Sequence, residues 1–548
     1  MLPHATAHQP TPSPRPRLLP VAAAALLLAS SYLALTRLPA AAPLAALVAP
    51  ATARVDGDRD RDSCAGFYRG GSSGRRAASA SVEEFGAVGD GARSNTAAFR
   101  RAVAELGARA VGGGGARLDV PPGRWLTGSF NLTSRFTLFL HRGAVILGSQ
   151  DPEEWPLITP LPSYGRGRER LGPRHISLIH GEGLNDVVIT GNERISSYIC
   201  LLSGSGNKGN IFFFASSRGQ TSSGSNGTID GQGHMWWELW RNRTLNHTRG
   251  HLIELVNSTN VLISSVTLSN SPFWTVHPVY CSNVVMKDLT ILAPLDAPNT
   301  DGIDPGLCAS CYFHYHGQLD LYGQLLSLIG TIIMADSSSE VCIEDCYIES
   351  GDDLVAVKSG WDQYGISFGK PSTNIVIQRV SGTTPTCSGV GFGSEMSGGI
   401  SNVLVRDLHV WNSAQAVRLK TDVGRGGYIT NITIASVAME KVKVPIRFSR
   451  GADDHPDDRY DPAALPRISN VLVSDVVGVH LQRAPMLEAV PGAVYEGICF
   501  RNFSFRGIRR QQDSRWHCES VYGEAHDVFP APCEEFRRDG SSSWCGLL

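Results

Sequence analysis

Three aspartates and a cationic pair are the residues of this chain whose types and spacing best suit catalysis. Asp301 lies in an Asn-Thr-Asp motif, Asp352 and Asp353 are adjacent in a Gly-Asp-Asp motif, and an Arg-Leu-Lys triplet downstream contains Arg418 and Lys420. Hydrolysis of a sugar–sugar bond needs one carboxyl group that donates a proton and another that activates water. A cationic pair suits a substrate that carries carboxylates. The pattern therefore predicts a glycosidase for a uronic acid polymer.

A short phrase, asparagine followed by three mostly apolar residues, recurs along the chain and predicts the elements that must position these groups. It begins at Asn260, Asn283, Asn374, Asn402, Asn431 and Asn470, with a variant at Glu340. Several successive starts lie 23, 28 or 29 residues apart, which suits one coil of short strands and turns. We therefore expect an all-β fold, a right-handed parallel β-helix in which each coil buries its inward side chains. An ordinary β-sandwich is the alternative.

Two segments, 193–225 and 306–335, interrupt this rhythm. Asp301 and Asp352 are 51 residues apart, and removal of the 30 residues from 306 to 335 leaves 21, about one coil. Adjacent coils would then stack the carboxylates. We interpret both segments as non-native insertions, either translated introns or a gene-model error. Cysteines and histidines in the second segment superficially resemble a zinc knuckle, but they are too closely spaced for a usual finger, so no metal is expected.

The strand geometry also makes predictions within each motif. Asp352 and Asp353 would point to opposite faces of an ideal strand, so we expect an irregular bend there. Arg418 and Lys420 are two residues apart and should share one face of a strand, while their apolar neighbours turn into the core. Both cations would then line the groove.

The ends of the chain differ in composition from its middle. Residues 1–50 carry an apolar run after two arginines, which is typical of a secretory signal peptide or an uncleaved signal anchor, and residues 51–80 are expected to be a linker. Residues 81–548 are the predicted β-helix glycosidase domain, with a cysteine-rich C-terminal cap. The stretch from Arg100 to Ala110 predicts a helix that covers the open end of the first coil.

The chain carries seven Asn-x-Ser/Thr sequons, which favour export and glycosylation. We expect a secreted protein of the extracellular space or cell wall; the alternative is a membrane protein of the secretory pathway with a lumenal catalytic domain. The 49 basic and 51 acidic residues nearly balance, which argues against nucleic acid as a partner. Membrane contact is expected only through an N-terminal anchor, and we expect a monomer that needs no cofactor.

With these motifs the chain resembles glycoside hydrolase family 28, the polygalacturonase or pectinase family, and more closely its plant polygalacturonase-like branch. The resemblance covers about residues 82–510, and its most specific parts are Asn299-Thr-Asp-Gly-Ile-Asp304, Ser350-Gly-Asp-Asp-Leu-Val-Ala-Val-Lys358 and Val417-Arg-Leu-Lys420. It implies inverting hydrolysis of α-1,4-galacturonosyl bonds of pectin in the plant cell wall. Asp352 would be the general acid, while Asp301 and Asp353 would hold and deprotonate the attacking water. An inverting pair stands about 6.5 to 9.5 Å apart to admit that water.

The resemblance also assigns Arg418 and Lys420 to the substrate carboxylate and shows one departure. The other expected substrate-binding residues are Asn299, His277 and Ser388. The fourth motif of the family, Gly-His-Gly, should fall near residues 387–395, where Ser388 takes the place of the histidine. His277 or Glu395 could line the groove instead, or have a structural role.

The missing histidine keeps two other functions open. One is a catalytically impaired β-helix that only binds pectin. The other is a Ca²⁺-dependent polysaccharide lyase, which would need clustered acids for the ion and an Arg or Lys base, and would give unsaturated products.

Overall fold

The structure, a computed structural model, describes residues 64, 67–68, 76–109, 114–191, 226–306, 339–450, 454–508, 514–537 and 545. The predicted targeting segment 1–50, the segment 193–225, and all of 306–335 except Gly306 lie outside these ranges, as does most of the predicted linker. Among the described residues, none of the helices has the length and apolar character needed to span a membrane.

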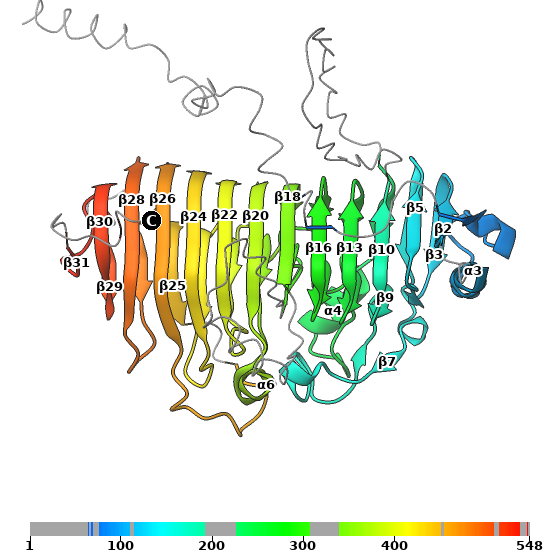
Figure 1. The fold of residues 1–548 in the computed structure, drawn as a ribbon, viewed down its shortest axis with the longest axis horizontal. Coiled ribbons are helices and arrows are strands. Elements are labelled where there is room, and N and C mark those ends of the chain that lie inside the picture. The colour runs from blue at the N-terminus through cyan, green and yellow to red at the C-terminus, as the bar shows by residue number, and fades with distance from the viewer. Residues whose placement is uncertain are drawn as a thin grey trace, which may run out of the picture. The chain divides into compact units, whose positions relative to one another are not determined.

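Short strands wind into a parallel β-helix, in which each strand pairs with its equivalent on the next coil (Figure 1). Apart from β7 with β8, the strand pairs of the described residues are parallel. Parallel pairing between coils excludes the sandwich alternative, whose sheets are antiparallel. The predicted fold class, an all-β right-handed parallel β-helix, is confirmed.

The larger sheet of the described residues has 19 strands. From β18 onward, the first half of each long strand continues the row of β16 and the second half continues the row of β17. The strands are β1 (Ala78–Ser81), β2 (Ala116–Val120), β3 (Gly123–Thr127), β5 (Phe136–Leu140), β6 (Ala144–Gly148), β10 (Asn185–Thr190), β11 (Thr228–Asp230), β13 (Thr259–Ser264), β14 (Thr267–Ser269), β16 (Ser282–Lys287), β17 (Thr290–Leu292), β18 (Ser339–Glu349), β20 (Ser372–Thr383), β22 (Ile400–Trp411), β24 (Tyr428–Glu440), β26 (Arg467–Val479), β28 (Tyr495–Arg506), β30 (Val521–Phe529) and β31 (Phe536–Arg537).

A second row of strands, here called the short-strand sheet, lies on another side of the coils. It comprises β4 (Phe130–Asn131), β9 (Ile179–Glu182), β12 (Ile253–Val256), β15 (Val276–Val279), β19 (Val355–Val357), β21 (Ser388–Phe392), β23 (Gln415–Thr421), β25 (Val444–Arg450), β27 (Met486–Glu488) and β29 (His517–Glu519). Isolated bridges through Ile303 and Gly306 connect β15 with β19. The row is therefore continuous from β4 to β29.

Helices occupy the end and the edges of this solenoid. They are η2 (Val82–Phe85), α3 (Thr96–Arg109), η4 (Pro152–Glu154), η5 (Pro162–Tyr164), α4 (His234–Arg241) and α6 (Asp362–Phe368), and β7 (Leu157–Ile158) with β8 (Arg174–His175) forms a small antiparallel pair. Helix α3 lies at the N-terminal end of the described coils (Figure 1) and buries Phe99 and Leu106 completely. The predicted capping helix is thus present, but it begins four residues earlier than expected.

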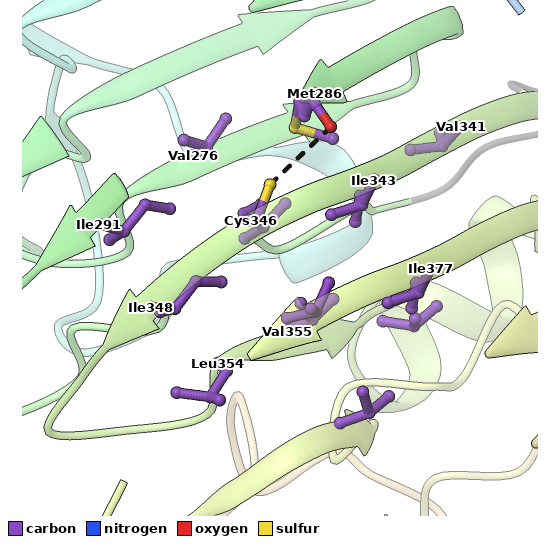
Figure 2. Packing of buried hydrophobic residues seen from close by; sticks show 14 of the residues in the cluster. Val276, Met286, Ile291, Val341, Ile343, Cys346, Ile348, Leu354, Val355 and Ile377 are labelled. Atoms are coloured by element: carbon purple, nitrogen blue, oxygen red, sulfur yellow. Dashed lines mark hydrogen bonds between the residues drawn. The ribbon is translucent and has the colours of Figure 1, made fainter. Parts of the chain in front are cut away.

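The core consists of inward side chains that stack from coil to coil. Ile343 and Ile377 are direct ladder partners on β18 and β20, and both are fully buried. Figure 2 shows them pointing into the same interior as Val355, with the Cys346 thiol directed at the Met286 carbonyl. Each such aliphatic side chain contributes roughly 1.5–3 kcal/mol on burial, and every added coil extends the same core.

The asparagine that opens each repeat phrase has a backbone role. Asn374, Asn402 and Asn431 adopt φ values of 55°, 55° and 54°, the left-handed conformation that asparagine tolerates better than most residues. Their side chains form a ladder: Asn431 Nδ2 donates to Asn402 Oδ1 over 3.2 Å, and Asn402 Nδ2 donates to Asn374 Oδ1 over 3.3 Å. The recurring phrase therefore marks the turn at which each coil enters its long strand.

Disulfides tie the C-terminal end and the middle of the described domain. Cys499 pairs with Cys545 and Cys518 with Cys533, in the region of the predicted cysteine-rich cap. Cys64 pairs with Cys342 of β18, on a middle coil. Because β1 begins at Ala78 and pairs with β2, the linker boundary expected at residue 80 falls inside a strand.

We expect the substitution Asn402→Ala to lower the free energy of unfolding by about 1–2 kcal/mol, because alanine is strained at positive φ and makes no ladder hydrogen bond. Asn402→Gly should cost less than half as much, since glycine adopts this φ freely. Thermal and urea unfolding of the two variants measure the difference. Equal losses in both variants would contradict a role for the backbone conformation.

Candidate active site

Asp301 and Asp353 lie on neighbouring coils of the short-strand sheet. Ile303 bridges Val355 in parallel register, and the Gly302 N–H donates to the Asp353 carbonyl over 3.0 Å. The two carboxylates thus come from adjacent coils, as the one-coil spacing left after removal of 306–335 predicted.

The Gly-Asp-Asp motif forms the predicted bend between β18 and β19. Gly351 and Asp352 lie in a bend, which is closed by hydrogen bonds from the Asp352 N–H to Ser350 Oγ over 2.9 Å and from the Asp353 N–H to Asp352 Oδ1 over 2.9 Å. A Cβ at position 351 would lie 2.1 Å from the Ala297 carbonyl oxygen, so only glycine fits. The bend leaves Asp352 half-buried and Asp353 fully buried.

Asp353 is held in its ionised form. Burial alone would raise its pKa, but the Lys420 ammonium and the Ser388 hydroxyl, which both hydrogen-bond its carboxylate, lower the pKa below its ordinary value. The Ser388 N–H donates to the same carboxylate over 2.8 Å. A Cβ on Gly391 would lie 2.9 Å from Asp353 Oδ2, so a glycine there leaves space for the carboxylate.

Asp301 has the opposite electrostatic environment. It is 3% exposed, and burial together with the neighbouring Asp352 raises its pKa to about 7, although Lys358 opposes the shift. Two buried carboxyls on adjacent coils therefore differ in protonation, since Asp353 is ionised while Asp301 titrates near neutral pH. Such a split is what separates acid and base functions in one groove.

The cationic pair of the sequence occupies alternate positions of β23. Arg418 and Lys420 point outward, while Val417 and Leu419 are 1% exposed on the inside, as predicted. Lys420 binds Asp353, whereas Arg418 Nε donates to Ser449 Oγ over 3.2 Å.

Arg447 on β25 is a further cation that the sequence did not single out. It is the ladder partner of Arg418 on the next coil. Burial and the Arg418 guanidinium lower its pKa, and its Nε has no hydrogen-bond partner among the described residues. Two half-buried guanidinium groups on adjacent coils form a site for an anion.

Three residues expected to touch substrate are engaged with the protein itself. His277 is fully buried, and its Nδ1 lies 3.0 Å from Glu254 Oε1. Asn299 Oδ1 accepts from the Arg249 guanidinium over 2.8 Å. Ser388 is fully buried against Asp353. Of the two roles left open for His277, groove-lining or structural, the structure shows the structural one, because the outward face of β15 is covered. The Ser388 hydroxyl, expected to bind substrate, instead donates to the Asp353 carboxylate.

Glu254, on β12, is the centre of a buried polar cluster. Arg174 donates to both of its carboxylate oxygens, at 3.0 and 2.8 Å, and His251 and His277 lie 3.3 and 3.0 Å from Oε1. Burial lowers the pKa of both histidines, so they are neutral. Two imidazoles and a carboxylate could ligate a metal. However, Arg174 already neutralises the charge of Glu254. The cluster is therefore an Arg174–Glu254 ion pair with His251 and His277 beside it.

A segment of residues 156–175, here called the strap, crosses the outward face of the short-strand sheet. It contains β7, η5 and β8. Its ion pairs to the body of the domain are Arg174–Glu254 at 2.8 Å, Glu169–Arg249 at 2.5 Å, Arg168–Glu395 at 2.6 Å and Arg168–Asp454 at 2.8 Å. The outward side chains His180, Glu254 and His277 on the coils beneath are at most 6% exposed.

Tyr164 of the strap closes this part of the face. Its ring packs edge-on against Trp274 and His277, with centroids 6.1 and 6.5 Å away. The cavity that remains between strap and sheet is about 20 Å³, which has room for one water and none for a sugar ring. The groove is thus closed on the coils before Asp301, while Arg418 and Arg447 on later coils are partly exposed.

A parallel β-helix whose outward face carries three aspartates beside arginine and lysine defines a carbohydrate-cleaving enzyme. The model of Glycosyl hydrolases family 28 matches residues 186–316 and 332–525. A probable polygalacturonase of Vitis vinifera is 42% identical over 465 residues, which are 85% of this chain and 82% of that protein. The chain therefore belongs to glycosyl hydrolases family 28, and the predicted family and enzyme class, a pectin-hydrolysing glycoside hydrolase, are confirmed.

Solved structures agree with the fold. The exopolygalacturonase of Thermotoga maritima superposes with a TM-score of 0.59 at 25% identity, covering 79% of this chain and 87% of that one. The polygalacturonase of Erwinia carotovora gives a TM-score of 0.55 at 19% identity, covering 82% and 97%. The second likeness shows the shared β-helix alone.

We expect Gly391→Ala to reduce kcat at least tenfold, because its methyl group would displace the Asp353 carboxylate that Lys420 and Ser388 hold. Gly306→Ala is the matched control on an earlier coil, since a Cβ there has its nearest neighbour, His277 Nε2, at 3.4 Å. Initial rates on a galacturonan substrate measure both. A Gly391→Ala enzyme as active as Gly306→Ala would show that Asp353 need not stay in place.

Proposed function

We propose that this protein hydrolyses α-1,4 bonds between galacturonate residues of pectin with inversion, as part of plant cell wall metabolism. Asp352 donates the proton to the leaving oxygen, and Asp301 and Asp353 hold and deprotonate the water. The observation that carries this assignment is the split between an ionised Asp353 and a neighbouring Asp301 that titrates near pH 7. The Asp352 carboxyl contributes to this split, because its charge disfavours that of Asp301 and so raises the pKa of Asp301.

Substrate recognition fits a polyanion. The Arg418 and Arg447 guanidinium groups lie on adjacent coils in register, and a galacturonate carboxylate between them would relieve their mutual repulsion. Lys420 contacts Asp353 and acts on the substrate through that carboxylate. An impaired, pectin-binding protein is the second candidate, because Ser388 stands where the family has a histidine.

The protein is proposed to work outside the cell, or in the lumen if residues 1–50 remain as an anchor. Three disulfides suit an oxidising compartment. The sequon asparagines Asn131, Asn242 and Asn257 are exposed and so accessible to glycosylation.

The two interrupting segments are proposed to be dispensable. A Cβ on Gly191 would lie 3.3 Å from the Gly227 nitrogen, so the chain leaves and re-enters the coil at one place around 193–225. The family match is itself interrupted between residues 316 and 332, inside the second segment. Gly306 bridges Val279 and Lys358, so after the second excision the residue that then follows Pro305 takes over that position.

Release of reducing ends from de-esterified pectin tests the function, with the chain as printed and with a version lacking 193–225 and 306–335. Asp352→Asn should lower kcat/KM by about 10²–10⁴, the usual contribution of a general acid, and the new reducing ends should first appear as the β-anomer. Asp407→Asn, at an exposed aspartate on β22 with φ 55°, is the matched control. Folded but inactive protein in both versions would favour the binding protein, and unsaturated products would favour a lyase.

The closed coils beneath the strap add a prediction about the mode of cleavage. The last strand covered by the strap, β15, is separated from β19 by two inter-strand spacings, roughly 10 Å. On the strap side of the catalytic carboxylates there is therefore room only for the end of a polysaccharide chain. We expect short products from the start of the reaction and a slow fall in viscosity, as the likeness to an exopolygalacturonase supports. Chromatography of early products measures this. Early products that include long oligomers of many sizes would contradict it. Tyr164→Ala, which opens the face beneath the strap, should give longer products than wild type.

A further inference from the structure

Lys358 is a buried cation at the centre of the site to which the sequence analysis gave no role. It follows β19, and its Nζ lies 3.4 Å from Asp301 Oδ2, 3.4 Å from Asp304 Oδ1 and 3.5 Å from Glu395 Oε2. The Trp274 ring closes another side, with its centroid 4.3 Å away. Lys358 is 3% exposed, so its charge acts on these groups with little screening by water.

The partners of Lys358 do not share its charge equally. Glu395 is also bound by Arg168 of the strap at 2.6 Å; burial would raise its pKa, but Lys358 and Arg168 hold it below the ordinary value. Asp304 is fully buried, and neither of its oxygens accepts a hydrogen bond from a described residue. Burial and the Asp301 charge raise its pKa well above the ordinary value, so it keeps its proton. The Lys358 ammonium is therefore shared by two carboxylates, those of Asp301 and Glu395.

We propose that Lys358 is a positioning residue that favours the ionised, water-activating form of Asp301, and that Glu395, fixed by Arg168 of the strap, holds Lys358 in place. The Lys358 ammonium lies 3.4 Å from the Asp301 carboxylate and stabilises its charge. Lys358 thus sets the pH above which Asp301 can act as the base. The proposal rests on the hydrolytic function proposed above.

The sign of the effect follows from the groups that face Asp301. These are Asp352 and Asp353, which disfavour its charge, Asp304, which keeps its own proton, and Lys358 and Lys420, which favour the charge of Asp301. Removal of the Lys358 charge leaves Asp352 and Asp353 opposed by Lys420 alone. Asp301 then keeps its proton to a higher pH. The ionised base is therefore missing over a wider range of acidic pH, and activity begins at a higher pH.

The pH profile of kcat/KM tests the proposal. In Lys358→Met the acidic limb should move to higher pH by about one to three units, the usual effect of one opposite charge at this distance. Lys358→Arg should keep the wild-type limb, because it restores the charge. Lys441→Met removes an exposed lysine and is the matched control. A Lys358→Met enzyme with uniformly lower activity and an unmoved limb would overturn the proposal.

Glu395 provides a test of opposite sign that does not need Lys358 to be removed. In Glu395→Gln the ammonium loses a competing carboxylate, so the limb should move to lower pH. In Lys358→Met the buried Glu395 keeps Arg168 but loses Lys358. In the double variant Lys358→Met/Glu395→Gln that glutamate charge is gone, so the unfolding temperature should rise above that of Lys358→Met while the limb stays at high pH. Recovery of the limb in the double variant would mean that Lys358 only neutralises Glu395, and would overturn the proposal.

A second readout separates this proposal from the proposed function. If the wild-type protein releases no reducing ends, the hydrolytic function fails, but the titration of Asp301 can still be followed by thermal unfolding. Because its folded pKa is raised from 3.8 to about 7, wild type should lose stability relative to Asp301→Asn as pH rises through that window. In the Lys358→Met background the loss should extend to higher pH. An unchanged window would refute the role of Lys358.

Discussion

The in-register parallel ladder between coils is the constraint on which the rest of this structure depends. A backbone hydrogen bond such as that from Gly302 to Asp353 fixes where one coil lies on the next, and the side chains of equivalent positions then follow at the ladder spacing of about 4.8 Å. Inward, this makes a continuous aliphatic core. Outward, it places carboxylates and guanidinium groups from distant parts of the sequence within reach of one another, so the geometry of the site is a property of the repeat.

Close stacking of acidic residues also creates repulsion between their carboxylates, and this repulsion determines their protonation. Asp301, Asp304 and Asp353 are all buried on neighbouring coils, and they cannot all be charged at little cost. Cations on the coils bias the protonation of each carboxyl: Lys420 stabilises the charge on Asp353, and Lys358 opposes the raised pKa of Asp301. Differences in protonation among chemically identical groups thus arise from which neighbour each one faces.

The coil repeat and the catalytic carboxylates could be predicted from sequence because each leaves a local signal. The recurring asparagine reports a left-handed turn, and the Gly-Asp-Asp motif reports a bend that only glycine permits. Other features leave no such signal. The roles of Glu254 and Lys358 depend on partners on neighbouring coils and on the strap, which lie far away in the sequence. The strap is an irregular segment whose ion pairs reach positions 80 to 286 residues distant. His277 and Ser388 were assigned to the groove by analogy, whereas covering by the strap and capture by Asp353 decided their positions.

The bond between Cys64 and Cys342 joins the start of the described domain to a strand at its middle. A protease that cleaves anywhere between these two residues produces two polypeptides that remain covalently linked, and the ladder keeps them stacked. On a non-reducing gel a nicked molecule would migrate with the intact one, and only a reductant would reveal the cut. Maturation of this protein by internal cleavage would therefore be invisible to the assays that report chain length under oxidising conditions.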